Sequence, residues 1–440
     1  MNCEQQIITK KNLQVKLHHF LRILKFSFSL PQYKFILDMV LGIIKSQSVI
    51  CNRIARALGE TITNKKTCER LYRHLSKDGL GDKIQQHIIE MQAKKFNEDT
   101  VIIVDESDIV KTRAKKMEGI AKVRDGSTGV CNQNGYALMN IAACNIHGES
   151  YELLPVSSDL ISGKIEVDSL VQIAQDRMIE IILACGNLGT FVFDRGFDSR
   201  VMLRFMKEHG CSFIIRCVGR RSLIVDGKEQ SFKQVAKSVK LNHIVASKSG
   251  RDAFEVGLKR VKVRLNGHPV KDPDTIELWL VVARYTPKHK GAKDGFFYFL
   301  CDFPNQDLSL ETIAQKALQM YRMRWKIEEM HKHIKQEYGW EKMQLMSYVG
   351  LKNMNQLLLL TMCYVYSLKS YAHKLLHSFP SLMGYTNGKW KQIYDFIYYR
   401  ISAVLSYCFA HVRRYKILKF GGKWAEGQQM IIPCLKNGGM

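Results

Sequence analysis

Two short apolar runs that each end in an aspartate are the feature that most constrains how this chain can fold. Val101–Val104 leads directly into Asp105, and Thr190–Phe193 leads directly into Asp194. Runs of this length, rich in β-branched and aromatic residues, predict buried strands. Neighbouring strand ends in one sheet can bring two carboxylates within a few ångströms. The sequence therefore predicts a sheet with a pair of acidic side chains at strand ends.

Further extended and helical stretches surround these two runs. Tyr136–Asn145 and Tyr151–Val156 are extended and are separated by a turn at His147-Gly148. A helical stretch near Asp168–Ala184 and another strand at Cys211–Arg216 follow. Strands joined first by short turns and then by helical crossovers predict an α/β fold, with a mixed sheet flanked by helices.

The segment after this sheet region is different in character. Short alternating runs at Val256–Leu265, Ile276–Tyr285 and Phe296–Leu300 predict a β-rich insertion, and a helical region begins near Leu310. We therefore expect five parts, which are a helical N-terminal domain (1–95), the first part of the core (96–218), the insertion (219–305), the second part of the core (306–375) and a basic C-terminal region (376–440).

The N-terminal region carries helical patterns and a basic stretch. Gln32–Gln47 and Asn52–Leu58 are apolar at helical spacing, and Cys68–Ser76 contains two arginines and a histidine. A small DNA-binding domain and a plain helical packing domain both fit these residues. No helix-turn-helix pattern is clear enough to place a recognition helix.

The charge of the chain implies a polyanionic partner. There are 66 Lys and Arg residues against 41 Asp and Glu residues, which gives a formal charge of +25. Such an excess most simply indicates binding to nucleic acid, although a merely basic or ribosome-associated protein has the same balance. The C-terminal region contributes strongly to the excess.

Cysteines and apolar runs exclude other classes of protein. The 12 cysteines form no C-x-x-C pair, which argues against a zinc site. A disulfide framework is not expected in a chain of this length. We therefore expect the protein to work in a reducing cytosol. The N-terminus lacks the pattern of a signal peptide. The most apolar run, Leu357–Leu368, is too short to span a bilayer and predicts a buried helix, so no membrane partner is expected.

A later helical segment has an unusual polar face. Four polar side chains fall within an arc of about 60° around the helix axis, at about 100° per residue. They are Tyr321, Arg324, Glu328 and Lys335. The apolar residues of the same segment lie on the opposite side. The second face therefore holds a carboxylate among cations, which suits a metal-bound phosphate.

Three more residues lie beside this polar face. Lys332 lies close enough to the face to contact phosphate. His331 fits either a phosphate contact or an ordinary surface histidine. Trp325 borders the face, and we expect it to pack against the core rather than to wall a site.

The segment that contains Asp194 holds two more polar side chains. Arg195 can neutralise phosphate, and Asp198 is expected to cap the helix that follows. Asp194–Asp198 reads Asp-Arg-Gly-Phe-Asp.

Three carboxylates can meet at this edge. Asp105 and Asp194 end strands, and Glu328 projects from a helix that can pack across them. Three hard oxygen ligands suit Mg²⁺ or Mn²⁺, and two such ions can promote phosphoryl transfer. Glu106 and Asp108 lie beside Asp105, but Asp105 is favoured because it follows the apolar run directly.

The motif Y-x2-R-x3-E-x6-K is matched without a gap by the four residues of the polar face. This segment resembles the third-carboxylate region of bacterial insertion-sequence transposases, the DDE enzymes of the IS-four family. The string Asp-Arg-Gly-Phe-Asp resembles the second-aspartate region of that family, and Val-Asp-Glu-Ser-Asp resembles the first. The resemblance covers roughly residues 95–350.

This resemblance implies an RNase H-like catalytic domain that is interrupted by the β-rich insertion. Asp105, Asp194 and Glu328 would bind the two metal ions, and Tyr321, Arg324 and Lys335 would hold DNA phosphates. In this family an aromatic residue after the insertion stacks on a flipped base. Phe297 lies near the equivalent position and Tyr298 competes with it, while a core position is equally compatible with either residue.

The resemblance also implies an activity and its partners. Such an enzyme would act as a homodimer on double-stranded DNA, cutting at terminal inverted repeats and joining the freed 3′-OH to target DNA. Two other functions remain open on the sequence. One is a DNA-binding repressor without catalysis, and the other is an RNase H-like nuclease without strand transfer.

Overall fold

The computed structural model describes residues 3–126, 128–148, 150–166, 168–246, 253–266, 274–285, 295–304, 306–384 and 397–419. The contacts between residues divide the chain into two compact units. The sheet unit is residues 75–367. The helical unit combines residues 1–74 with the chain from residue 368 onward, so both ends of the chain belong to one unit.

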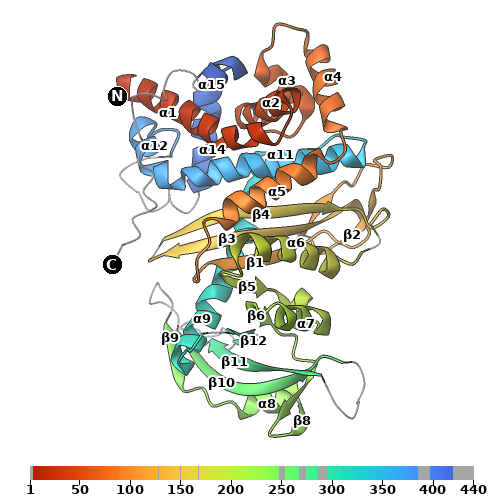
Figure 1. Ribbon diagram of the computed structural model, residues 1–440, viewed down its shortest axis with the longest axis vertical. Helices are drawn as coiled ribbons and strands as arrows, with labels where there is room; N and C mark the ends of the chain where they lie inside the picture. Colours follow the sequence, from red (N-terminus) through yellow and green to blue (C-terminus); the bar gives the residue numbers. More distant parts are fainter. Residues whose placement is uncertain are drawn as a thin grey trace. The chain divides into compact units, whose positions relative to one another are not determined.

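Three parallel strands form the centre of the sheet unit (Figure 1). They are β1 (Val101–Val110), β5 (Thr190–Phe193) and β6 (Ser212–Arg216), which lie side by side in this order. Val101 pairs with Thr190, and the register runs to Val104 and Phe193. Because both strands point the same way, Asp105 and Asp194 follow the last pair at the same end of the sheet.

Antiparallel strands extend the sheet on both sides of this centre. On the β1 side lies β3 (Gln133–His147), which also pairs with β2 (Ala121–Val123) and β4 (Ser150–Ile161). On the β6 side lie the strands of the insertion, beginning with β12 (Gly295–Asp302). The insertion continues with β11 (Thr275–Tyr285), β10 (Ala253–Arg264), β9 (His243–Ala246), β8 (Lys228–Ser231), β7 (Ser222–Val225) and the helix α8 (Phe232–Ser238). The insertion therefore extends the same sheet.

Helices cover this sheet. The core cluster joins α6 (Leu170–Cys185) and α7 (Arg200–Glu208) to one face of β1, β5 and β6 through residues such as Val104 and Phe193. Alternation along the strands directs Asp105 and Asp194 to the opposite face. The helices α9 (Leu310–Met323) and α10 (Trp325–Glu337) both contact β1, and α9 also contacts β5.

Two further helices pack on β4, away from the parallel strands. They are α5 (Leu80–Ala93) and α11 (Tyr348–Ser367), and they also pack on each other. Most of α11 is buried, which confirms the buried helix predicted for Leu357–Leu368. Residues 80–93 therefore pack with the sheet unit.

Local signals set the ends of α6. The side chain of Ser169 accepts a hydrogen bond from the backbone N–H of Gln172, which caps the first turn. Gly186 follows the last turn with φ of 66°, and its N–H donates to the carbonyl oxygen of Ile182. A left-handed residue at this position costs glycine little, so the chain can leave the helix and begin β5.

The helical unit is built from both ends of the chain. The N-terminal segment forms α1 (Cys3–Arg22), η1 (Ile23–Phe26), α2 (Leu30–Ser46), α3 (Cys51–Leu58) and α4 (Asn64–Leu75). The C-terminal segment forms η4 (Leu368–Tyr371), α12 (Ala372–Ser378), α14 (Ile397–Phe409) and α15 (Arg414–Lys419). The helices α14 and α15 both pack on α2, and α12 packs on α1.

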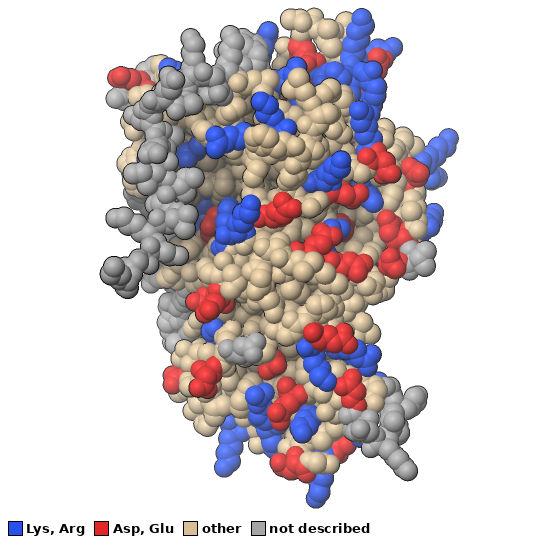
Figure 2. Space-filling view, viewed as in Figure 1, with Lys and Arg blue, Asp and Glu red and all other residues tan. Residues whose placement is uncertain are grey.

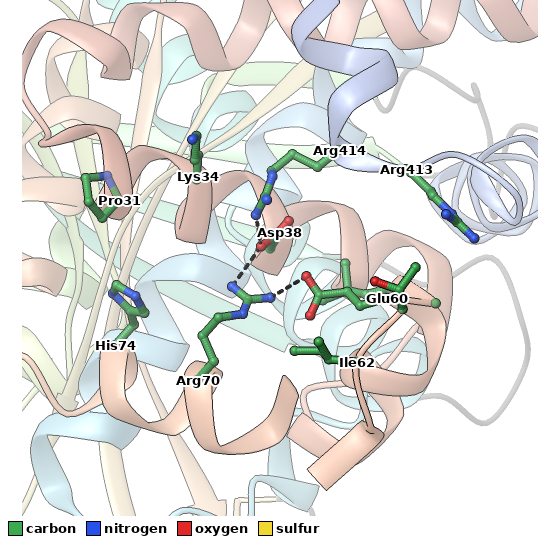
Figure 3. Close-up of a pocket in the computed structure, with 12 residues that line it drawn as sticks. Pro31, Lys34, Asp38, Glu60, Ile62, Arg70, His74, Arg413 and Arg414 are labelled. Atoms are coloured by element: carbon green, nitrogen blue, oxygen red, sulfur yellow. Dashed lines mark hydrogen bonds and ion pairs between the residues drawn. The ribbon is translucent and has the colours of Figure 1, made fainter. Parts of the chain in front are cut away.

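A buried carboxylate joins three of these helices (Figure 3). Asp38 on α2 is 2 % exposed, and its Oδ2 forms ion pairs with Nη1 of Arg70 on α4, at 2.9 Å, and with Arg414 on α15. Arg70 also pairs with Glu60 at 2.8 Å. Burial raises the pKa of Asp38, although both arginines oppose the shift. One carboxylate therefore ties the C-terminal segment to the N-terminal helices.

Removal of Arg414 should destabilise the helical unit. The Arg414→Ala variant leaves the buried Asp38 carboxylate with one partner fewer. This should lower the free energy of unfolding by about 1–3 kcal/mol. Thermal unfolding and hydrogen exchange of α2 should both show the loss. The neighbouring Arg413 is exposed and serves as the matched control, because Arg413→Ala removes the same charge without touching Asp38. Equal stability of the two variants would contradict this account.

The expected architecture of a mixed sheet flanked by helices, with a β-rich insertion and helical terminal regions, is confirmed. The sequence analysis missed β2. It was also wrong about Asp198, because the cap of α7 is Ser199, whose side chain accepts from the N–H of Met202. The Asp198 carboxylate instead pairs with Arg221 and accepts from the N–H of Val218 at 2.9 Å.

No single helix in the described ranges is both long enough and apolar enough to cross a membrane. The bent pair formed by α2 and α3 meets the length and composition test only when the two helices are taken together.

Candidate active site

The pairing of β1 with β5 positions two aspartates on one face of the sheet unit. Val104 and Phe193 are paired residues, and Asp105 and Asp194 come next on their strands. The side chain of Asp105 is 14 % exposed. Asp194 lies in the passage from β5 to the short helix η2 (Arg195–Phe197). Asp194 is close enough to Asp105 to help raise the pKa of the Asp105 carboxyl group.

The helical segment that carries the other candidate residues is not continuous. It consists of α9 and α10, and the break between them falls at Arg324. The N–H of Arg324 bonds to the carbonyl oxygen of Tyr321, and Arg324 O accepts from Ile327, so the turn is tighter than an α-helical turn. The expectation of one straight helix from Tyr321 to Lys335 is therefore wrong at this point.

Tyr321 and Arg324 lie against the acidic residues. The hydroxyl of Tyr321 donates to Oδ1 of Asp194 at 3.2 Å. Nη1 of Arg324 lies 3.5 Å from Oδ1 of Asp105, and its Nη2 lies 2.6 Å from Oε1 of Glu328. The arginine is 6 % exposed. It therefore bridges the first strand-end aspartate and the glutamate of α10.

The three carboxylates together carry more negative charge than Arg324 offsets. Burial raises the pKa of Asp105 to about 7; Arg324 opposes this shift, while Glu328 and Asp194 add to it. A carboxyl group with a pKa near neutrality next to two other acids indicates a place that is short of positive charge.

The donor types in this place fit a hard divalent cation. Carboxylate oxygens are the ligands that Mg²⁺ and Mn²⁺ prefer. Within the part of the chain that the structure describes, however, no three acidic, histidine or cysteine side chains converge closely enough to form a ready-made metal site. The guanidinium of Arg324 holds the position between Asp105 and Glu328. A metal ion bound by both carboxylates would require Arg324 to release at least one of them.

Lys335 lies farther along the same edge. Its Nζ is 3.1 Å from Oε1 of Glu341 and 3.8 Å from Oδ2 of Asp108. Asp108 is buried and also accepts from the N–H of Gly126 at 2.9 Å, whereas Glu106 is exposed. Lys335 is therefore paired with acids outside the group formed by Asp105, Asp194 and Glu328.

The residues beside the polar face differ from expectation in two places. Trp325 is 60 % exposed and lies beside the guanidinium of Arg324, so the expected packing of Trp325 in the core is wrong. His331 is 7 % exposed and packs near Trp340, so the expectation of a surface or phosphate-binding histidine is also wrong. Lys332 and Arg195 are exposed and have no recorded ion pair among the described residues.

An aromatic cluster lies around Arg216. The guanidinium of Arg216, at the end of β6, lies 5.2 Å from the ring centre of Phe297 on β12. The rings of Phe297 and Phe254 lie 6.2 Å apart, and Phe254 in turn lies under Arg322. Phe297 is half-buried. Tyr298 faces the other way and packs edge-on against Phe232 in the core cluster.

The match to a family of known proteins covers most of this unit. The family model described as "Transposase DDE domain" matches residues 97–366, which is more than half of the chain. The chain belongs to the transposase DDE domain family. The matched segment contains the three carboxylates and Tyr321, Arg324 and Lys335. By this family membership, the chain is a DDE transposase.

Two other comparisons add little to this assignment. No curated protein matches the chain. Among solved structures, one similar chain is described as "Drosophila P element transposase strand transfer complex". It is 9 % identical, with a TM-score of 0.17, and the match covers 83 % of this chain and 92 % of that chain. A TM-score this low carries no structural argument.

The sequence analysis missed several residues near the candidate active site. Arg216 is the clearest, because it ends β6 just as Asp194 follows β5, and the paired register of the two strands places it nearby. Arg322 and Phe254 are the others. Their proximity depends on the packing of α9 against β10, for which the sequence has no local signal.

Two buried histidines make the stability of α10 depend on pH. His333 is 1 % exposed, and its Nδ1 lies 3.1 Å from the hydroxyl of Tyr366. Burial lowers the pKa of His331 and of His333 to about 3. The unfolded chain, in which histidine has a pKa of about 6.5, therefore binds more protons between these values.

Stability should accordingly be lost as the pH falls below about 6.5. Each histidine contributes up to about 1.4 kcal/mol per pH unit in that range. Hydrogen exchange of α10 in the transposase, measured from pH 8 to pH 5, should show protection declining. A His333→Gln variant should show a shallower decline than the wild type, even if it is less stable overall. If protection declined with pH equally steeply in the wild type and in the variant, His333 would not be buried in its neutral form.

Proposed function

We propose that this transposase catalyses cut-and-paste transposition of an insertion sequence. It would hydrolyse phosphodiester bonds at terminal inverted repeats and then transfer the freed strand to target DNA. The observation that carries the proposal is the meeting of Asp105 and Asp194, from paired parallel strands, with Arg324 and Glu328 from the helical break. Acids, a guanidinium and a phenol in one place suit a phosphodiester held next to metal ions.

In this proposal Asp105, Asp194 and Glu328 hold Mg²⁺ or Mn²⁺, with two ions per site. Bound there, divalent cations would supply activation of the attacking oxygen and charge stabilisation at the leaving oxygen. Arg324 and Tyr321 would turn from their present carboxylate partners to phosphate oxygens. Lys335 would hold a neighbouring phosphate, and the exposed Lys332 and Arg195 would add weaker contacts.

Further parts of the proposal concern DNA and assembly. Lys and Arg side chains gather over α4 in Figure 2, and Lys65, Lys66 and Arg73 of this helix are exposed. These cations support a DNA-binding role for the N-terminal helices. We also propose that the active form is a homodimer on paired transposon ends, and that it works in the cytosol at the nucleoid.

A matched pair of substitutions on α10 tests the carboxylate role. Glu328→Gln should reduce metal-dependent cleavage of duplex DNA taken from the borders of the gene by at least about a hundredfold, because a carboxylate ligand is lost. Glu329→Gln removes the same charge from the next residue, which is 53 % exposed and pairs with Lys326, and should change cleavage less than about twofold. Both variants should bind this DNA as the wild type does.

The products of the wild type distinguish the remaining alternatives. Joined DNA products, dependent on Mg²⁺ and stopped by chelation, are expected for a transposase that completes strand transfer. Cleavage without joining would instead support a nuclease. Binding without cleavage, in the presence of Mg²⁺ or Mn²⁺, would support a repressor and overturn the proposal.

Phe297 is proposed to stack on an unpaired base at the cut end. Support comes from its half-buried ring next to Arg216, since a ring flanked by a guanidinium suits base stacking. Phe297→Ala should weaken binding to an end duplex with one unpaired base by about 1–3 kcal/mol. Its neighbour Phe296 is 49 % exposed and provides the control, for which binding should be nearly unchanged. Equal effects of the two changes would remove Phe297 from this role.

A further inference from the structure

A groove in the sheet unit lies beside the candidate active site but shares none of its three carboxylates. It has a volume of about 760 Å³ and lies between two segments, residues 110–117 after β1 and residues 341–346 after α10. Neither segment belongs to the motifs that the sequence analysis identified.

The two walls of the groove are tied together by hydrogen bonds. Lys111 is 8 % exposed, and its Nζ donates to the carbonyl oxygens of Glu341 at 2.5 Å and of Met343 at 2.6 Å. The N–H of Glu118 donates to the carbonyl oxygen of Met346 at 2.9 Å. A buried cation that satisfies two carbonyl groups holds the first loop firmly against the second. The groove is therefore a built feature of the unit.

The lining combines an apolar floor with a cationic rim. Met343 and Leu345 are buried in the floor. The rim is formed by exposed side chains that have no recorded ion pair among the described residues, namely Arg113, Lys115, Lys116 and Lys342. Glu341 is the one acid among the described lining residues, and it pairs with Lys335. Uncompensated cations above an apolar floor complement phosphates and the apolar faces of deoxyribose rings.

Lys335 connects the groove to the strand that carries Asp105. It pairs with Glu341 in the groove and with Asp108 on β1, three residues after Asp105. Asp105 and Lys111 are six residues apart at the end of β1, a span of about 20 Å at about 3.4 Å per residue. That distance corresponds to about six base-pair steps of duplex DNA. A duplex with its scissile phosphate at Asp105 can therefore reach the rim.

The composition of the rim indicates which DNA it binds. Lysine presents a point charge on a flexible stem, which binds backbone phosphate without reading the bases. Gln344 supplies the one amide side chain among the described lining residues, and Arg113 is the one guanidinium, so the lysines that bind backbone phosphate predominate. A surface made mainly of backbone contacts suits DNA of arbitrary sequence better than a fixed terminal repeat.

We propose that this groove binds the backbone of target DNA during strand transfer. The proposal rests on the proposed transposase function, and it assigns to Arg113, Lys115, Lys116 and Lys342 a binding role that is separate from the chemistry at Asp105, Asp194 and Glu328.

The test uses the full-length protein and a triple variant of the rim, Arg113→Ala/Lys115→Ala/Lys116→Ala. These side chains are exposed, so the variant should fold. A triple variant with the same charge change on β8 and α8, Lys228→Ala/Lys233→Ala/Lys237→Ala, is the matched control. Two reactions are compared, which are cleavage at a border duplex and joining of a pre-cut border duplex to a supercoiled plasmid of unrelated sequence.

The ratio of the joining rate to the cleavage rate should fall about tenfold in the rim variant. In the control variant this ratio should stay within about twofold of the wild-type value. Binding to a random-sequence duplex, measured over a range of salt, should also lose two to three units of the slope of log K against log salt, because about 0.9 unit is expected per phosphate contact. Equal losses of joining and cleavage would assign the groove to the transposon end instead. An unchanged salt slope would overturn DNA binding in the groove.

The salt measurement needs no catalysis. If the wild type neither cleaves nor joins, the proposed function fails, but the groove is still tested by the slope. If the wild type is active and the rim variant keeps both its slope and its joining, the groove proposal alone fails.

Discussion

The parallel pairing of β1 with β5 is the constraint on which the rest of the sheet unit depends. A parallel pair requires a long crossover, and α6 provides it on one face of the sheet. That leaves the other face for α9 and α10. The pairing register then decides that Asp105 and Asp194 are adjacent, since a slip of one residue would turn one carboxylate into the core. Tyr321 then bonds to Asp194 and Arg324 pairs with Asp105, while Glu328 joins the group through Arg324.

Arg324 offsets part of the repulsion that this pairing creates. Three acids in a half-buried place would oppose one another strongly, and a guanidinium with two carboxylate partners lowers that cost. The tight turn at the junction of α9 and α10 brings its side chain to the acids. Arg324 therefore stabilises the fold at the place where the proposed function would require it to turn to a phosphate.

Much of this arrangement could be predicted from local sequence, and the exceptions have physical causes. Apolar runs ending in Asp105 and Asp194 are visible because strand burial leaves a local pattern. Trp325 and His331 were misplaced because both lie at the border of the polar face, where tertiary packing rather than helical periodicity decides exposure. Phe297 could not be separated from Tyr298, because only the sheet register, in which Ala283 pairs with Phe297, decides which ring faces the acids. Groups such as Arg322 and Phe254 meet through long-range packing that leaves no local trace.

The union of both chain ends in the helical unit has a consequence for synthesis. Asp38 is translated early, but its partner Arg414 emerges only after the whole sheet unit has been made. At about 5–20 residues per second, the segment between Asp38 and Arg414 takes roughly 20–75 s to produce. During that interval the N-terminal helices exist without their C-terminal complement, while the sheet unit is being made. The sheet unit can therefore fold on the ribosome before the helical unit is complete.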